Sequence, residues 1–159
     1  MNATLNVAGP ANSLQEEITL TSQLVDILKR EQAHLIAADI NGLKAVTEEK
    51  SQVVSKISAL TAQRYHALKL AGFDAMEGGM RAWIKSSKQL AEVDQAWANL
   101  LQLAQTVKNL NNTNGLLIGK HITYNQNALN VLQGTRATGF YGPDGQTTNK
   151  LRQRGLVVG

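Results

Sequence analysis

A seven-residue repeat of large apolar side chains in the second half of the chain restricts the fold more than any other feature. Its members are Leu103, Leu110, Leu117, Tyr124 and Val131, and Leu100, Val107 and Ala128 flank them. Side chains at this spacing lie along one side of an α-helix. The polar run Asn109–Gly115 has the composition of a loop, but the repeat keeps its phase on both sides. We therefore expect one helix over about 88–133, roughly 65–70 Å long at 1.5 Å per residue.

Two shorter amphipathic segments precede this helix. The first, over 13–40, repeats Leu14, Thr21, Leu28 and Leu35 every seven residues. The second, over about 45–71, has Leu43, Val46, Val53, Ile57, Leu60 and Leu68 at spacings typical of a helix. Ser13 and Glu16 form a capping-box pattern at the first start, and Asn41-Gly42 indicates a break between the two segments. Gly72 is a natural helix stop.

Glycine interrupts the helical pattern in two places. We expect 72–88 to be a connection with one short helix around Gly79–Ile84, whose Trp83 and Ile84 pack on the bundle. After Gly134 the repeat ends, and Gly142-Pro143-Asp144-Gly145 is typical of a turn. The predicted fold is all-α: an antiparallel three-helix bundle or coiled coil with one very long third helix. It occupies 1–134, and 135–159 is expected to be an irregular, flexible basic tail rather than a separate domain.

The composition excludes several classes of protein. A length of 159 residues suggests one domain, and an aromatic content of only 4% argues against a β-sandwich or barrel. The absence of cysteine excludes disulfides, thiolate metal sites and cysteine nucleophiles. The first 13 residues do not form a secretory signal, and no apolar run approaches the ~20 residues of a membrane span. We expect a cytoplasmic protein.

The net charge of +4 comes from the end of the chain. Residues 120–159 contain Lys120, Arg136, Lys150, Arg152 and Arg154 against Asp144 alone. A basic segment can attract nucleic acid. These charges are sparse and have no aromatic residues between the arginines, so we do not expect a nucleic-acid partner.

No group of residues has the spacing of an active site. His34, His66 and His121 lie apart, and we interpret the adjacent acidic pairs Glu16-Glu17 and Glu48-Glu49 as partners of the helix dipole. The segment Gly115–His121 differs from a phosphate-binding loop in its spacing and in having His121 where Ser or Thr holds magnesium. We expect no enzymatic activity, cofactor, metal or small-molecule substrate.

The chain resembles a known family over nearly its whole length. Matching residues in the first two helices are Leu28, Asp39, Leu43, Lys50, Leu60, Arg64 and Gly72. The third helix adds Asn114-Gly115-Leu116-Leu117, and the tail adds Phe140-Tyr141-Gly142-Pro143-Asp144-Gly145-Gln146, which is the most specific part. With these residues the chain resembles the FlgN family of flagellar type III export chaperones. It departs from the family at Gly78-Gly79-Met80-Arg81 in the connection.

The resemblance implies a cytoplasmic, non-enzymatic protein with two partners. It implies binding to the C-terminal helical segments of the hook-associated proteins of the hook–filament junction, which prevents their premature assembly and delivers them to the export gate. It also implies that a C-terminal tyrosine docks on the cytoplasmic domain of the export-gate membrane protein. Tyr141, next to Phe140, matches this position best, and Tyr124 is the alternative.

We expect the long helix to carry the client-binding stripe, because three helices of unequal length cannot cover every apolar position of the longest. The stripe consists of Leu100, Leu103, Val107, Leu110, Leu117 and Val131. Its alternative interpretation is intramolecular core. The alternative function is a coiled-coil adaptor or scaffold that pairs with itself, and the sequence leaves both a monomer and a homodimer open.

Overall fold

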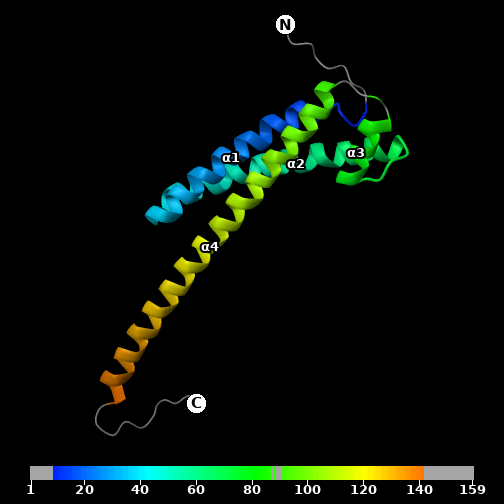
Figure 1. The fold of residues 1–159 in the computed structure, drawn as a ribbon. Coiled ribbons are helices and arrows are strands. Elements are labelled where there is room, and N and C mark those ends of the chain that lie inside the picture. The colour runs from blue at the N-terminus through cyan, green and yellow to red at the C-terminus, as the bar shows by residue number, and fades with distance from the viewer. Residues whose placement is uncertain (1–8, 87, 89–90, 142–159) are drawn as a thin grey trace. The chain divides into compact units, whose positions relative to one another are not determined.

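The computed structural model describes residues 9–86, 88 and 91–141, with side chains described as far as 134. Within these residues the elements are four α-helices: α1 (Leu14–Ala37), α2 (Ile40–Leu70), α3 (Glu77–Ser86) and α4 (Ala91–Tyr141) (Figure 1). The all-α prediction is confirmed, since the described part contains no strand. The chain divides into two units, Met1–Leu117 and Ile118–Gly159, which are described separately below.

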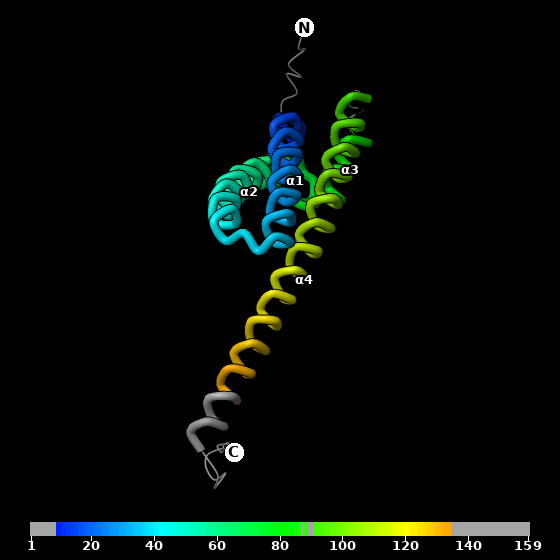
Figure 2. The backbone as a smooth tube through the Cα atoms, turned by 90° about the vertical axis from the view of Figure 1, so that its left-hand side faces the viewer, coloured from blue at the N-terminus to red at the C-terminus, as the bar shows by residue number. Residues whose placement is uncertain are grey.

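In the first unit, α1 and α2 form an antiparallel hairpin (Figures 1 and 2). The chain reverses at Ala38, which adopts the left-handed conformation with φ of 53°. Asp39 then caps α2, because its carboxylate accepts a hydrogen bond of 3.0 Å from the Gly42 amide. The predicted break at Asn41-Gly42 is therefore wrong by a few residues, and both residues belong to the first turn of α2. Gly42 is needed there, since a Cβ would overlap the His34 ring.

The start of α1 also differs from the prediction. Ser13 occupies the cap position in a helical conformation and makes no capping hydrogen bond with its side chain. Its hydroxyl instead donates to the Glu17 carboxylate at 2.9 Å. The capping box of Ser13 and Glu16 is absent because the serine orients Glu17, which points into the protein.

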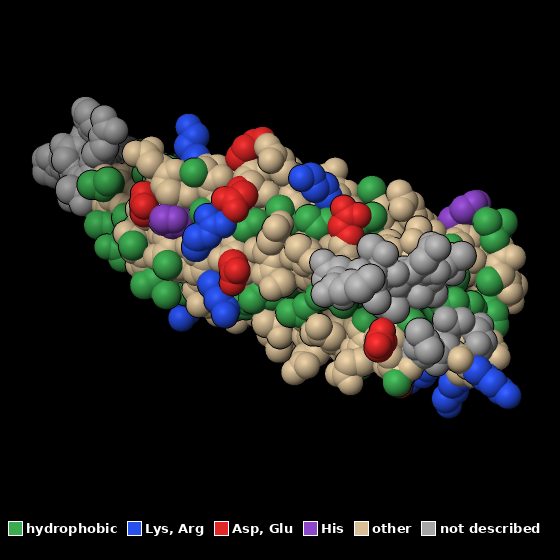
Figure 3. Space-filling view, turned by 90° about the horizontal axis from the view of Figure 1, so that it is seen from above, with side chains coloured by type: hydrophobic (Ala, Val, Ile, Leu, Met, Phe, Trp, Pro, Cys, Tyr) green, Lys and Arg blue, Asp and Glu red, His purple; other side chains and the backbone are tan. Residues whose placement is uncertain are grey.

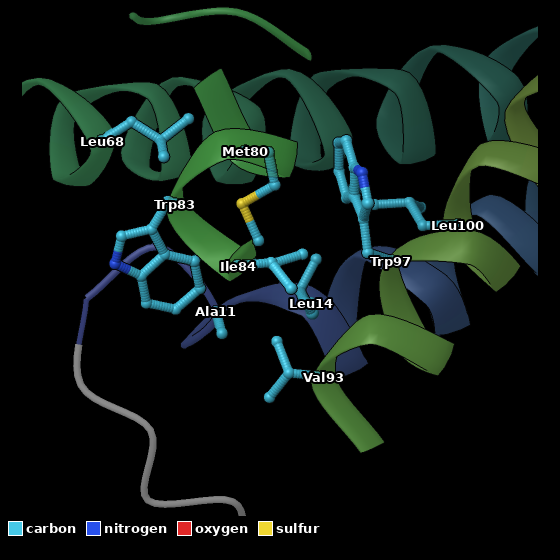
Figure 4. Close-up of a cluster of buried hydrophobic side chains, with 9 residues drawn as sticks. All are labelled: Ala11, Leu14, Leu68, Met80, Trp83, Ile84, Val93, Trp97 and Leu100. Atoms are coloured by element: carbon cyan, nitrogen blue, oxygen red, sulfur yellow. The ribbon is translucent and has the colours of Figure 1, made fainter. Parts of the chain in front are cut away.

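Two apolar clusters form the core of the first unit. One joins the start of α1, the end of α2, α3 and the start of α4 and contains Ala11, Leu14, Leu68, Met80, Trp83, Ile84, Val93, Trp97 and Leu100 (Figure 4). The other lies between α1 and α2 and contains Leu20, Leu24, Ile27, Leu28, Val46 and Val53, with Val107 and Leu110 of α4 packed against it. The short helix predicted around Gly79–Ile84 is confirmed as α3, and its Trp83 and Ile84 are buried as expected.

The fourth helix passes through Asn109–Gly115 without interruption, which confirms the prediction made from the phase of the repeat. It ends at Tyr141, beyond the predicted end near 133, so residues 135–141 are helical rather than irregular. Gly134 alone does not stop a helix, because an exposed glycine costs only about 1 kcal/mol relative to alanine. The first proline downstream is Pro143. The predicted turn Gly142–Gly145 and the rest of the predicted tail lie outside the described residues.

Candidate functional site

The residues predicted to bind a client do not share one environment. Leu100 is buried in the first apolar cluster, and Val107 and Leu110 pack against the second. Leu103 and Leu117 are half-buried, whereas Val131 is 68% exposed. The seven-residue repeat is therefore half-buried at Leu103, Leu110 and Leu117 and exposed at Tyr124 and Val131.

A second apolar row, which the sequence analysis missed, lies in the part of α4 that belongs to the second unit. It consists of Ile118, Ile122, Leu129 and Leu132, which are 44–63% exposed. Their spacings of four, seven and three residues place them on one side of the helix. Tyr124 and Val131 are also exposed, but they lie more than about 100° round the helix from this row. We call Ile118, Ile122, Leu129 and Leu132 the C-terminal apolar face. In the sequence, this face is indicated by apolar residues that are three, four or seven positions apart. The seven-residue repeat at 117, 124 and 131 hid this second pattern.

The remaining surface of this segment is mostly polar and almost uncharged. It presents Gly119, Thr123, Gln126, Asn127, Asn130 and Gln133. Between 118 and 134 the ionisable side chains are Lys120, His121 and Tyr124, and none is acidic. This segment therefore offers apolar contacts and few charges for ion pairs.

The tyrosine and phenylalanine predicted to dock on the export gate lie in the last turn of α4. Phe140 and Tyr141 are helical, and their side chains lie outside the described part of the chain. The alternative tyrosine, Tyr124, is 73% exposed.

Glu17 and Arg64 form a buried ion pair between α1 and α2. Arg64 donates from Nε at 3.0 Å and from Nη2 at 3.1 Å to the Glu17 carboxylate, and the Thr61 hydroxyl donates to the same carboxylate. The guanidinium carbon lies 4.9 Å from the centre of the Trp97 ring and 5.1 Å from that of Tyr65. Glu17 is therefore part of the core, not the surface partner of the helix dipole that the sequence predicted.

A second buried polar group connects α1 with α2 and α4. The Glu31 carboxylate accepts from Lys50 Nζ at 3.1 Å and from Asn114 Nδ2 at 2.8 Å. Asn114 also donates to the carbonyl oxygen of Leu28 at 2.9 Å. Glu17 and Glu31 each stand three residues after a member of the repeat in α1, where a second apolar residue is expected. That position is the signal by which the sequence could have identified them.

Two other ion pairs, Arg30 with Glu49 and His34 with Asp39, lie on the surface rather than in the core. Arg30 and Glu49 make two hydrogen bonds across the hairpin, which raise the pKa of the guanidinium and lower that of the carboxyl. The pKa of Asp39 is lowered mainly by the hydrogen bond from the Gly42 amide. Figure 3 shows acidic and basic side chains interspersed with apolar ones on one face of the protein.

Among the described residues, no three His, Asp or Glu side chains gather as metal ligands would. None of the described helices has the length and hydropathy needed to cross a membrane.

The comparisons with known proteins agree with the sequence resemblance. The family model described as "FlgN protein" matches residues 1–149. A "Flagella synthesis protein FlgN" from Proteus mirabilis is 32% identical over 149 residues, covering 92% of both chains. Proteins of the same name from Salmonella typhimurium and Escherichia coli are 31% identical over 137 residues and 27% identical over 144 residues. Those two alignments cover 85% and 89% of this chain, and 87% and 92% of the relatives.

No solved structure matches the chain. The family match nevertheless covers almost the whole sequence, including every helix described above. The chain therefore belongs to the FlgN family of flagella synthesis proteins.

Proposed function

We propose that the protein is a cytoplasmic, non-enzymatic flagellar export chaperone. It binds the C-terminal helical segments of hook-associated proteins, prevents their premature assembly, and delivers them to the export gate. Membership of the FlgN family supports a role in flagellar synthesis. The observation that carries the proposal further is the C-terminal apolar face, because exposed apolar rows on a helix are typical of surfaces that bind another amphipathic helix.

The size of this face suits a client that has to be released. Each of its side chains contributes roughly 1.5–3 kcal/mol when it becomes fully buried. The loss of translational and rotational freedom offsets several kcal/mol of this sum, and a client segment that folds on binding offsets more. The net binding free energy therefore favours a moderate affinity, so that a bound client can still dissociate.

Docking on the export gate is assigned to Phe140 and Tyr141. They follow the C-terminal apolar face along the chain, so a client and the gate engage different residues of α4. The alternative function, self-association as a coiled-coil adaptor, uses the same apolar face with a second copy as its partner.

The test is a pair of charge substitutions on opposite sides of one helix. Ile122→Glu with Leu129→Glu introduces charge on the apolar face, and we expect it to weaken binding of a hook-associated C-terminal peptide at least about 100-fold. Asn127→Glu places the same charge on the polar side and should change affinity by only a few-fold. Calorimetric titration measures both.

Circular dichroism and sedimentation equilibrium complete the test. Both variants should keep the helicity of the wild type, since the substituted side chains are exposed. Loss of helicity together with binding would show that the face stabilises the fold and is not a site. A free protein that dimerises through Ile122 and Leu129 and does not bind the peptide would favour the adaptor instead.

A further inference from the structure

A groove in the first unit contains none of the residues of the C-terminal apolar face. Its volume is about 280 Å³, and its walls come from α1, α2 and α4, with Glu77 of α3 at the edge of the lining. Leu24, Ile57, Leu101, Ala104 and Val107 make most of the surface apolar. Sites for small molecules measure about 300–1,000 Å³, so this groove suits a few side chains of a peptide rather than a cofactor.

Two residues that line this groove each have a buried nitrogen without an acceptor among the described residues. Nη1 of Arg64 and Nε1 of Trp97 make no hydrogen bond to any described residue, and the two side chains are only 6% and 5% exposed. In Figure 4 the Trp97 indole extends from α4 toward α2, the helix that carries Arg64. Buried donors are nearly always paired in folded proteins, because an unpaired one costs about 1–3 kcal/mol. An acceptor supplied by a partner would satisfy both donors.

The charge of the site identifies the acceptor as a neutral one. The other nitrogens of Arg64 already bond to the Glu17 carboxylate, so the ion pair has no net charge. An entering carboxylate would be repelled by Glu17, whereas a main-chain carbonyl oxygen would not. Carbonyl groups without a partner are found at the last turn of a helix, where four of them lack an intrahelical donor.

We propose that the groove binds the C-terminal turn of a partner helix, with the free carbonyls of that turn accepting hydrogen bonds from Arg64 and Trp97. Apolar side chains of the same turn pack on Leu101 and Val107. This inference rests on the proposed function, since the partner is the C-terminal helical segment of a hook-associated protein. The two donor nitrogens are covered in the free protein, so their side chains change rotamer when the partner enters, as interface side chains commonly do.

Two substitutions test the groove without unfolding the bundle. Trp97→Phe keeps a ring against Arg64 and removes the indole N–H. The smaller ring leaves a gap in the core, so the variant should stay folded with somewhat lower thermal stability, and it should bind the client peptide about five-fold more weakly. Ala104→Phe fills the groove from an exposed position and should weaken binding at least about ten-fold. Gln102→Phe is the matched control, because Gln102 is exposed on the same helix and does not line the groove.

A nuclear magnetic resonance titration reports on the donor directly. The chain contains two tryptophans, Trp83 and Trp97, so a ¹H–¹⁵N spectrum has two indole signals, and Trp97→Phe assigns them. On addition of the peptide we expect the Trp97 signal to move downfield while the Trp83 signal stays. If wild-type protein binds the peptide but the Trp97 signal is unmoved and Ala104→Phe binds normally, the groove assignment is overturned and the export function stands. If wild-type protein does not bind the peptide at all, the proposed function itself fails, and this inference with it.

Discussion

At the scale of single residues, the bundle depends on charged groups inside its core. The Glu17 side chain is 2% exposed and that of Arg64 is 7% exposed, and they form hydrogen bonds with one another across the hairpin. Removing one member of a buried pair leaves an uncompensated charge and typically costs 3–5 kcal/mol, whereas replacing both by apolar residues is often neutral.

We therefore expect strong coupling between these two positions. Glu17→Leu and Arg64→Leu should each lower the free energy of unfolding by about 3 kcal/mol or more, and the double variant should lose less than the sum of the two. Urea unfolding of the four proteins measures the coupling. Additive losses would mean that each residue acts through packing alone.

The pairing of Glu17 with Arg64 could not be predicted from the repeat. The partners are separated by 47 positions and lie on different helices, so the pattern of either helix alone says nothing about the other. Glu17 stands at a core position of the repeat in α1. This position indicates that the side chain is buried, but it does not identify the residue that pairs with it. The family resemblance includes Arg64 but does not identify the residue it pairs with.

At the scale of elements, α4 shows what an apolar repeat can and cannot predict. The repeat records which side of the helix packs, so its constant phase across Asn109–Gly115 predicted a continuous helix correctly. It does not record where hydrogen bonding along the backbone stops. The last turns of α4, 135–141, have no apolar repeat and were therefore assigned to the tail.

Continuity through the polar run has a measurable consequence at Gly115. A Cβ at this position meets nothing within 4 Å, and glycine is unfavourable inside a helix. Gly115→Ala should therefore raise the free energy of unfolding by about 0.5–1 kcal/mol, as measured by urea or heat. A destabilised variant would indicate that this segment is not helical in solution.

At the scale of the whole molecule, the two units differ in the structural features they contain. The first unit contains the two apolar clusters and the buried polar groups, and the second contains the C-terminal apolar face. The sequence predicted a client-binding stripe on the long helix from Leu100 to Val131, and the structure buries Leu100 while Val131 is exposed. Whether an apolar residue of α4 is covered depends on which other helices pack against it, and no pattern within α4 encodes this.

Two truncations separate the tasks of the C-terminal region. Removing 138–159 deletes Phe140 and Tyr141, whereas removing 142–159 keeps both. Neither deletion touches the clusters of the first unit, so thermal stability should be nearly unchanged and client-peptide affinity should stay within a few-fold. We expect the longer deletion to abolish binding to the cytoplasmic domain of the export gate, measured by calorimetry.

Two point variants identify the docking tyrosine. Tyr141→Ala should reproduce most of the loss caused by the longer deletion, and Tyr124→Ala should retain gate binding. The reverse result would transfer the docking role to Tyr124, and full gate binding without 138–159 would refute the assignment.

The scarcity of charge along 118–134 also affects the rates at which a partner would associate and dissociate. Without complementary charges to guide the encounter, the association rate constant should remain near 10⁵–10⁶ M⁻¹s⁻¹, and added salt should change it little. Differences between partners then appear as differences in residence time, because each additional buried side chain slows dissociation. For a helix with this surface, competition among partners is decided by how long each stays bound rather than by which arrives first.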